Sequence, residues 1–371
     1  MPLAGSPKAS VKAQFLVYVG TYTSKTSSKG IYAYRFDAEK GQVTPIGVAA
    51  ESADPSFLAV HPSGKYLYAV NEIGNFQGGN TGAVSAFAID RKTGALKLLN
   101  QVSSRGAGPC HISLDKTGNY VLVANYDSGS VASFPVRDDG SLGPTSGFVQ
   151  HSGSGPNKER QEGPHAHWIG TSPDNGFALA VDLGLDEVLV YRFDFERGRF
   201  APIIPGFAKV NPGAGPRHFA FHPDGKFAYV LNEMESSVTA FSFQAKDGSL
   251  SALQTIPTLP KDYAGARQAA ELVVHPSGKF LYASNRGQDS IAVFAINPTK
   301  GTLTSLGQVL TKGKTPRHFA IDPTGAYLFA ENQESNNIVV FRIDPTTGGL
   351  TPTDLVIEVP SPVCITFVAA E

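Results

Sequence analysis

A unit of about 50 residues recurs along this 371-residue chain, and the repeat restricts the fold more than any other feature of the sequence. Two clear copies are PSFLAVHPSGKYLYAVNE, which starts at Pro55, and PRHFAFHPDGKFAYVLNE, which starts at Pro216. The turn residue of each copy falls at Gly64, Gly118, Asn175, Gly225, Gly278 and Gly325, in steps of 54, 57, 50, 53 and 47 residues. A period of this length is typical of propellers and other repeat architectures.

Each copy contains the signals of four short strands. An alternating strand leads into a D/H-P-x-G turn, in which proline presets φ and glycine accepts a positive φ. An aromatic and β-branched strand follows, as in KYLYAV or KFAYVL, and then a third strand such as GSVASFPV or NNIVVFRID. A D-x-x-x-G-x-L turn opens the fourth strand. Four antiparallel strands about every 50 residues predict one propeller blade per copy.

The two chain ends supply one further blade. FLVYVGTYT, from Phe15 to Thr23, matches the second strand of the repeat, and GIYAYRFD matches the third. The first strand is found near the C-terminus as PVCITFV, from Pro362 to Val368. We therefore predict an all-β, seven-bladed β-propeller whose ring is closed by the C-terminal strand, with residues 15–371 forming a single domain. Residues 1–14 are small and polar, and we interpret them as a flexible leader or tag.

Equivalent positions of the repeat should form rings around the central channel, because the innermost strand of every blade lines it. One column follows the leading Pro or Ala of each copy: Ser56, Cys110, His167, Arg217, Ala270, Arg317 and Val363. A second column follows the Asn or Asp that ends the second strand: Glu72, Tyr126, Leu183, Glu233, Arg286 and Gln333, with Thr21 or Tyr22 in the first blade. Charges of both signs converge at one channel mouth, which predicts a pocket for a small anionic molecule.

Other histidines have simpler interpretations. His61, His222 and His275 occupy the turn position and are expected to bond the turn backbone. His111, His218 and His318 come one residue after the first column; strand alternation predicts that they turn away from the channel and pack between blades. His165 stands before its strand, where it either reaches the mouth or caps a loop. Cys110 is interpreted as a small pocket-lining residue, since nothing nearby in the sequence would activate its thiol.

Composition excludes several functions. The 31 Lys and Arg nearly balance the 32 Asp and Glu, so no nucleic-acid-binding surface is expected. Two cysteines cannot form a disulfide framework or a four-cysteine zinc site, and no P-loop, dinucleotide fingerprint, H-E-x-x-H or G-x-S-x-G motif is present. We expect no metal, no cofactor and no membrane span, with a calcium site made of scattered carboxylates and carbonyl groups as the alternative left open by the sequence. A cytoplasmic monomer is the default prediction; the alternative is an exported protein whose signal peptide is absent from this sequence.

Several of these motifs resemble the lactonase family of seven-bladed propellers, which includes propeller-type 6-phosphogluconolactonases and 3-carboxy-cis,cis-muconate lactonizing enzymes. The resemblance runs from about Val17 to Phe367 and is carried by GTYT, PCHISLDKTGNYVLVANY, GPHAHW, GPRHFAFHPDGKFAYVLNE and ASNRGQDSIAVF. It implies an active centre made of one histidine, two arginines and one glutamate. By motif these are His167, Arg217, Arg286 and Glu233, and all four already stand in the two columns.

The expected reaction is hydrolysis of a sugar lactone, with 6-phosphogluconolactone as the first candidate. His167 would move the proton, one arginine would hold the oxyanion, and Glu233 would orient an arginine or share the proton transfer. The alternatives are an unphosphorylated aldonolactonase, a carboxymuconate-type cycloisomerase, or a non-catalytic propeller that binds a partner. We expect six residues to contact substrate: His165, Glu72, Arg317, Cys110, Tyr126 and Gln333.

Two loops are expected near the mouth. The polar segment 150–164 runs directly into GPHAHW, and it is either a cover that uses Lys158 and Arg160 or a disordered surface excursion. The segment 261–270 carries Arg267, a weaker candidate for binding an anion.

Overall fold

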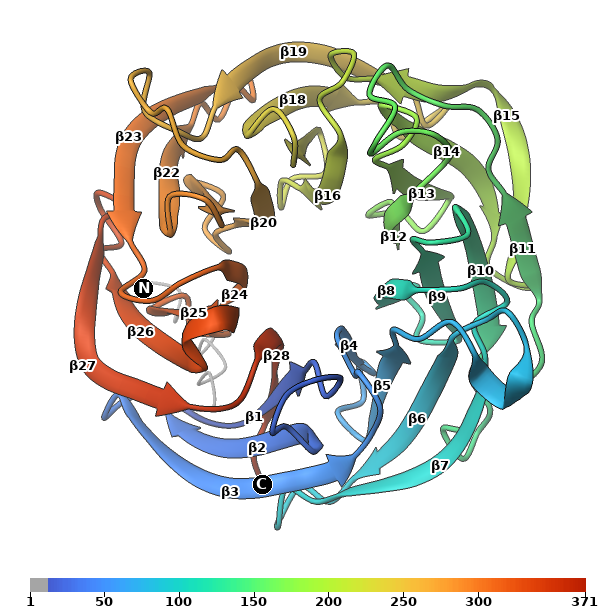
Figure 1. Ribbon diagram of the computed structural model, residues 1–371. Coiled ribbons are helices and arrows are strands. Elements are labelled where there is room, and N and C mark those ends of the chain that lie inside the picture. The colour runs from blue at the N-terminus through green and yellow to red at the C-terminus, as the bar shows by residue number, and fades with distance from the viewer. Residues whose placement is uncertain (1–12) are drawn as a thin grey trace, which may run out of the picture.

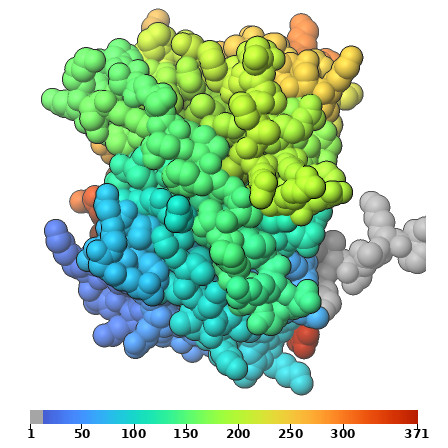
Figure 2. Space-filling model, turned by 90° about the vertical axis from the view of Figure 1, so that its right-hand side faces the viewer, coloured from blue at the N-terminus to red at the C-terminus, as the bar shows by residue number. Residues whose placement is uncertain are grey.

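Seven four-stranded antiparallel sheets surround a central channel in the computed structural model, which describes residues 13–371 (Figure 1). The predicted seven-bladed propeller is therefore confirmed. Neighbouring blades form a continuous wall when the molecule is viewed from the side (Figure 2). Residues 1–12 of the predicted leader lie outside the described residues, and the first strand begins at Gln14.

Every blade consists of four strands that follow one another from the channel to the outer surface. Blade 1 contains β28 (Pro362–Ala369), β1 (Gln14–Thr21), β2 (Gly30–Asp37) and β3 (Gln42–Glu51). Blade 2 contains β4 (Leu58–Val60), β5 (Tyr66–Asn71), β6 (Ala83–Ile89) and β7 (Leu96–Ser103). Blade 3 contains β8 (Pro109–Leu114), β9 (Tyr120–Asn125), β10 (Ser130–Pro135) and β11 (Gly147–Gln150). Blade 4 contains β12 (Ala166–Thr171), β13 (Phe177–Asp182), β14 (Glu187–Asp194) and β15 (Arg199–Lys209).

The remaining blades repeat the same order. Blade 5 contains β16 (Pro216–Phe221), β17 (Phe227–Asn232), β18 (Ser237–Phe243) and β19 (Leu250–Pro257). Blade 6 contains β20 (Ala269–Val274), β21 (Phe280–Asn285), β22 (Ser290–Ile296) and β23 (Leu303–Leu310). Blade 7 contains β24 (Pro316–Ile321), β25 (Tyr327–Asn332), β26 (Asn337–Ile343) and β27 (Leu350–Glu358). The helical turns η1 (Phe76–Gly78) and η2 (Gln333–Ser335) complete the elements, and across residues 13–371 no helix has the length and apolar character to cross a membrane.

Strand β28 closes the ring by pairing with β1. The pairing is antiparallel and runs from Phe15 opposite Ala369 to Thr21 opposite Pro362. The C-terminal strand thus becomes the innermost strand of the blade that the N-terminal strands build, as the repeat predicted. This pairing satisfies the backbone groups that would otherwise leave unpaired sheet edges where the circle closes.

The hydrophobic core lies between adjacent blades. In one cluster Tyr229 and Leu231 of blade 5 pack with Leu281 and Ala283 of blade 6, and all four side chains are buried. The repeat tyrosine also donates a hydrogen bond to the next blade, since the Tyr229 hydroxyl lies 3.0 Å from the Gly301 carbonyl oxygen. The tyrosine ring therefore contributes apolar burial, and its hydroxyl contributes a directional hydrogen bond, to the same contact between blades.

The turn histidines likewise link successive blades. His222 Nδ1 accepts a hydrogen bond from the Asp224 amide in its own turn, at 3.3 Å. His222 Nε2 lies 2.9 Å from the carbonyl oxygen of Gly278 in the next turn, and His275 makes the same contact with Gly325. The predicted structural role of these histidines is thus confirmed, and the contact with the neighbouring blade adds to it.

An extra residue interrupts the innermost strands where they begin. In β16, Pro216 pairs with Asn232 and His218 pairs with Leu231, so Arg217 has no partner of its own. Cys110, His167 and Arg317 occupy the equivalent unpaired place in β8, β12 and β24. Such a β-bulge changes the direction of the side chain that it carries.

The bulge overturns the prediction for the next histidines. His111, His218 and His318 do not turn away from the channel, because the bulge interrupts the alternation on which that prediction rested. Their rings converge on Phe57 of blade 2, with centroids 4.5, 5.7 and 5.5 Å from the Phe57 ring. These residues come from blades 2, 3, 5 and 7, so their meeting point lies on the axis and forms the floor beneath the mouth.

We predict that Gly301→Ala destabilises the protein by about 1–3 kcal/mol more than Gly307→Ala. Both glycines have positive φ, +68° and +107°, so both substitutions introduce backbone strain. A Cβ at Gly301 would overlap the Phe227 ring of the neighbouring blade, whereas nothing lies within 4 Å of the position at Gly307. Urea unfolding of the two variants measures the difference, and equal stabilities would contradict the inferred role of this contact.

Candidate functional site

A polar cavity of about 200 Å³ opens at one mouth of the channel. It lies where the bulged starts of inner strands meet the loops that follow second strands. Its walls are formed by eight residues: Glu72, Cys110, Tyr126, Arg160, His167, Glu233, Arg286 and Arg317. Seven of these eight residues belong to the two predicted columns. Blade 3 contributes two of them, and blades 2, 4, 5, 6 and 7 contribute one each. The eighth, Arg160, lies in the loop between blades 3 and 4. The repeat columns therefore do converge on one cavity.

Glu233 is the centre of the charge network. Its Oε2 lies 3.2 Å from Arg217 Nε and 3.0 Å from Arg286 Nη2, and its Oε1 lies 2.8 Å from Arg160 Nη2. Burial alone would raise the pKa of this carboxyl, but Arg286, Arg217 and Arg160 outweigh it and lower the pKa to about 2. Glu233 is therefore ionised throughout the neutral range and holds the guanidinium groups in place.

Arg217 is the most enclosed of these cations. The residue is 3% exposed, and its Nη1 also donates to the Ala270 carbonyl oxygen. Burial, with repulsion from Arg317 and Arg286, lowers the pKa of Arg217 to about 10. The group remains positively charged at neutral pH, held beside the cavity by a carboxylate and a backbone carbonyl.

The opposite wall contains a second carboxylate. The Tyr22 hydroxyl donates to Glu72 Oε2 at 2.9 Å, and the Ser56 hydroxyl donates to the same oxygen. Arg317 Nη2 donates to the Tyr22 hydroxyl at 2.8 Å, and its guanidinium lies 5.3 Å from the centre of the Tyr22 ring. Of the two candidates for the second column in blade 1, Thr21 and Tyr22, it is therefore Tyr22 that reaches this wall. Its hydroxyl connects Arg317 with Glu72.

His167 and Cys110 form the wall between the two carboxylates. His167 Nδ1 lies 3.7 Å from Cys110 Sγ. Burial, with the nearby charges of Arg217, His218 and Arg317, lowers the pKa of His167 well below its usual value, so the imidazole is neutral at pH 7. Burial also raises the pKa of the Cys110 thiol well above its usual value, so this group is not a thiolate nucleophile.

The segment 150–164, called the strap below, borders the cavity; Arg160 agrees with the first of the two interpretations of this loop, whereas Lys158 is exposed and does not line the cavity. Arg160 Nη2 reaches into the cavity, 3.3 Å from the Tyr126 hydroxyl as well as 2.8 Å from Glu233. The adjoining Gln161 is buried and donates to the Leu183 carbonyl oxygen at 2.9 Å and to Asp186 Oδ1 at 2.7 Å. These bonds hold the backbone of the strap while the Arg160 side chain remains 40% exposed.

Four of the sequence-predicted candidates lie outside the cavity wall, and Arg217 lies just behind it. The His165 ring stacks on Tyr126 with centroids 4.5 Å apart, so it supports the wall from behind. Gln333 lies in η2 and is not among the cavity residues. Arg267 is exposed and donates to the Glu235 carbonyl oxygen at 3.4 Å, and Lys158 is exposed on the strap.

Sequence reasoning underestimated Arg160 and Tyr22. Arg160 lies in an insertion between blades 3 and 4, where no other copy of the repeat has an equivalent residue. Tyr22 follows a strand in the blade that the two chain ends share, which left its alignment open between two positions. The only available signal was local: a basic residue in the loop before GPHAHW, and a tyrosine in GTYT.

The floor of the cavity contains further titratable groups. The His167 and His218 rings lie 5.2 Å apart, and His218 Nδ1 lies 2.9 Å from Glu271 Oε2. His318 Nε2 lies 3.5 Å from the same oxygen, and its Nδ1 lies 2.5 Å from Glu331 Oε2. Within residues 13–371, no three His, Cys, Asp or Glu side chains are grouped so that they could hold a metal ion.

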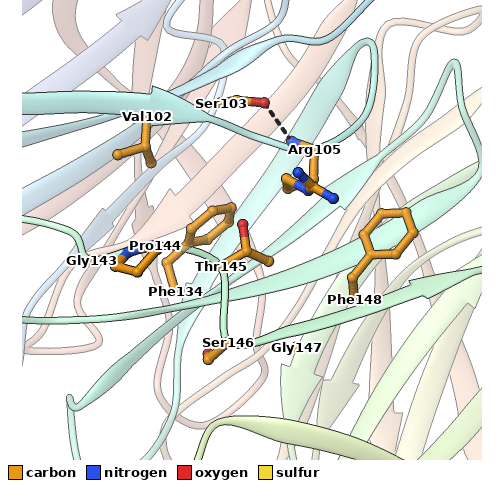
Figure 3. Close-up of a pocket in the computed structure, with 10 residues that line it drawn as sticks. All are labelled: Val102, Ser103, Arg105, Phe134, Gly143, Pro144, Thr145, Ser146, Gly147 and Phe148. Atoms are coloured by element: carbon orange, nitrogen blue, oxygen red, sulfur yellow. Dashed lines mark hydrogen bonds between the residues drawn. The ribbon is translucent and has the colours of Figure 1, made fainter.

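The cavity favours an anionic molecule, because four arginines in and beside its wall face two carboxylates. Its volume is below the roughly 300–1,000 Å³ typical of drug-sized pockets, so the cavity suits a small molecule. A larger hollow of about 480 Å³ lies on the outer surface between β7 and β11, where Arg105 lies over the Phe148 ring (Figure 3). That hollow has only one charged side chain in its lining, so the channel mouth is the better candidate site.

Comparisons with known proteins agree with this architecture. A family model described as "Lactonase, 7-bladed beta-propeller" matches residues 16–367. The chain is 40% identical over 306 residues to a 6-phosphogluconolactonase of Bacillus subtilis, covering 82% of this chain and 84% of that protein. A 6-phosphogluconolactonase of Formosa agariphila is 38% identical, covering 82% of this chain and 86% of that protein. The structure of a periplasmic gluconolactonase of Pseudomonas aeruginosa has a TM-score of 0.90 and 36% identity, covering 96% of this chain and 100% of that one.

We predict that Glu233→Gln destabilises the protein by about 3–5 kcal/mol at pH 7, because buried Arg217 loses its carboxylate partner. The pKa of Glu233 is lowered on folding, so its stabilising effect is present above about pH 4.5 and lost as the pH falls towards about 2. The difference in unfolding free energy between wild type and variant should therefore shrink across that interval. Urea unfolding at several pH values measures it, with Glu159→Gln on the exposed part of the strap as the control. A difference that does not change with pH would contradict the assignment.

Proposed function

Because the chain belongs to the lactonase family of seven-bladed β-propellers, we propose that it hydrolyses a sugar lactone in the channel-mouth cavity, with 6-phosphogluconolactone as the first candidate substrate. The observation that carries the proposal is the group of guanidinium ions that Glu233 holds at the cavity. Such a group suits an anionic substrate and a reaction in which negative charge develops on oxygen. Two relatives described as 6-phosphogluconolactonases support the same substrate class.

Hydrolysis requires water to attack the ring carbonyl carbon, which places a negative charge on the carbonyl oxygen. Arg286 or Arg217 would hold that oxyanion, a role in which the loss of one donor typically costs about 10²–10³ in kcat. Both arginines are held by the Glu233 carboxylate, so little reorganisation is needed when the charge forms. With its pKa lowered to about 2, Glu233 suits the task of orienting the arginines better than that of transferring a proton.

The phosphate of a phosphorylated sugar would lie towards the strap. Arg160 is the most exposed of the cavity cations, and a guanidinium group binds phosphate through two parallel hydrogen bonds. Its present partners, Glu233 and Tyr126, leave its side chain partly open to solvent. A phosphate that binds there would draw Arg160 from Glu233 and keep the other two arginines for the lactone carbonyl.

An unphosphorylated aldonolactone is the second candidate substrate. The relative described as a periplasmic gluconolactonase favours it, with 36% identity over nearly the whole chain. The same oxyanion chemistry would apply, and Arg160 would then bind sugar hydroxyls or remain on Glu233.

A panel of lactones tests the function directly. We expect hydrolysis of 6-phosphogluconolactone with a kcat/KM at least about tenfold above that for the unphosphorylated lactone, because one good charge-assisted contact contributes that much. Acid release is followed with and without a chelator, and the chelator should leave the rate unchanged. Preference for the unphosphorylated sugar would select the second candidate. Failure to accelerate any lactone, including a carboxymuconolactone, would favour a non-catalytic binding protein.

Arg160→Ala should raise KM for the phosphorylated lactone about tenfold and leave kcat nearly unchanged, since the contact is to a remote group of the substrate. KM for the unphosphorylated lactone should change little. Lys158→Ala, on the exposed part of the same strap, is the matched control and should behave as wild type. Equal effects of Arg160→Ala on both substrates would contradict the phosphate assignment.

A further inference from the structure

We propose that Glu72 is the general base of this reaction: its carboxylate removes a proton from the attacking water and later returns that proton to the ring oxygen. The inference rests on the proposed lactone hydrolysis and assigns the proton transfer to a residue outside the group of His167, Arg217, Glu233 and Arg286. It stands on three structural features: the one-sided bonding of Glu72, its contrast with Glu233, and the cations around His167.

The Glu72 carboxylate is bonded on one oxygen only. Tyr22 and Ser56 both donate to Oε2, and no described side chain or amide donates to Oε1. The residue follows β5, is half-buried, and forms part of the cavity wall. Two hydroxyl donors thus fix the orientation of the carboxylate while one acceptor oxygen remains available to a water molecule in the cavity.

The two carboxylates of the cavity have opposite surroundings. Glu233 is held by three guanidinium groups on both of its oxygens, so protonating it would break an ion-pair network. Glu72 has no guanidinium group within salt-bridge distance among the described residues, and Arg317 reaches it only through the Tyr22 hydroxyl. When two carboxylates share a site, different surroundings move their pKa values apart. Glu233 then suits a role in which it stays charged, and Glu72 suits a role in which it takes up and releases a proton.

The groups that face Glu72 have different effects on its proton affinity. They are Tyr22 after β1, Arg317 in β24, Cys110 in β8, Asp127 after β9 and the Ser56 hydroxyl before β4. Burial of the carboxylate and the charge of Asp127 raise its pKa, and Arg317, Ser56 and Tyr22 lower it. Burial outweighs the rest, so the pKa of Glu72 lies above its ordinary value, in the direction that makes a carboxylate a better base near neutral pH.

His167 is less suited to receive the proton. Protonation would place an imidazolium beside Arg217 and Arg317, and the cavity already has more cations than carboxylates. The neutral His167 ring instead offers a hydrogen-bonding group between the two carboxylates, where it positions the water or the substrate.

The proposed step is balanced without a further reactant. As the water oxygen bonds to the lactone carbonyl carbon, one water proton passes to Glu72, and the arginines hold the oxyanion. When the tetrahedral intermediate collapses, the bond from carbon to ring oxygen breaks and its electron pair stays on that oxygen. The oxygen takes the proton from Glu72, which returns the carboxylate to its starting state and leaves an open-chain hydroxy acid.

The test compares the pH dependence of kcat/KM in wild type, Glu72→Gln and His167→Gln. Wild-type activity should fall on the acid side as Glu72 becomes protonated. Glu72→Gln should lower kcat by at least about 100-fold with little change in KM, and the residual rate should lack this acid limb. His167→Gln should retain the limb. Glu72→Asp, the conservative variant, should recover part of the rate together with the limb.

The hydroxyl donors provide a second readout that a merely structural role would not affect. Ser56 and Tyr22 favour the charged form of Glu72, so their removal should raise its pKa further. Ser56→Ala and Tyr22→Phe should each move the acid limb to higher pH. Glu334→Gln, an exposed carboxylate at the corresponding end of blade 7, is the control and should leave the profile unchanged.

Each outcome decides the proposal. If wild type hydrolyses a lactone and Glu72→Gln keeps its rate and acid limb, or if His167→Gln removes the limb instead, the role of Glu72 is wrong and the proposed function stands. If wild type hydrolyses no lactone, both fall. Calorimetric binding of the hydroxy acid product, unchanged within about threefold in Glu72→Gln, shows that the cavity is intact; should that variant not fold, the Glu72→Asp and Ser56→Ala profiles decide.

Discussion

The extra residue at the start of the innermost strands is the constraint on which the site depends. A strand that alternated regularly would send Arg217 and His218 to opposite faces. Because Arg217 has no partner in β17, both residues face the channel, Arg217 towards the cavity and His218 towards the floor. The same irregularity in β8, β12 and β24 brings Cys110, His167 and Arg317 to the same level. A regular hydrogen-bonded scaffold thus carries irregular positions at its centre, where chemistry can differ from blade to blade.

The propeller was predictable from sequence because each of its elements has a local signal repeated several times. The number of blades, the closure by the C-terminal strand and the family resemblance are all confirmed, since turn residues such as Gly225 and strands such as KFAYVL occur at a steady period. The repeat also located most of the cavity wall, because equivalent positions in a closed ring must lie near one another.

The features that the sequence did not reveal depend on breaks in that regularity. His111, His218 and His318 were assigned to the wrong side because a bulge leaves no distinct mark in the residue pattern. Arg160 was named only as one residue of a loop that could cover the mouth, because it lies in an insertion that has no counterpart in other blades and no column includes it. The different surroundings of Glu72 and Glu233 were also out of reach, since the two residues occupy the same repeat position and differ only in the partners that the folded ring brings to them.

The aromatic and imidazole floor has a consequence for turnover. Phe57 and the three histidine rings around it meet on the axis, so they close the channel just below the proposed reaction site. In the proposed reaction, substrate and product would both pass through the one open mouth, beside the strap. The hydroxy acid product, more negatively charged than the lactone, would leave past the arginines that attract the substrate. The positive charges that bind the substrate would thus also slow the release of the product. Turnover in such a site is expected to be fastest when neither the substrate nor the product binds tightly.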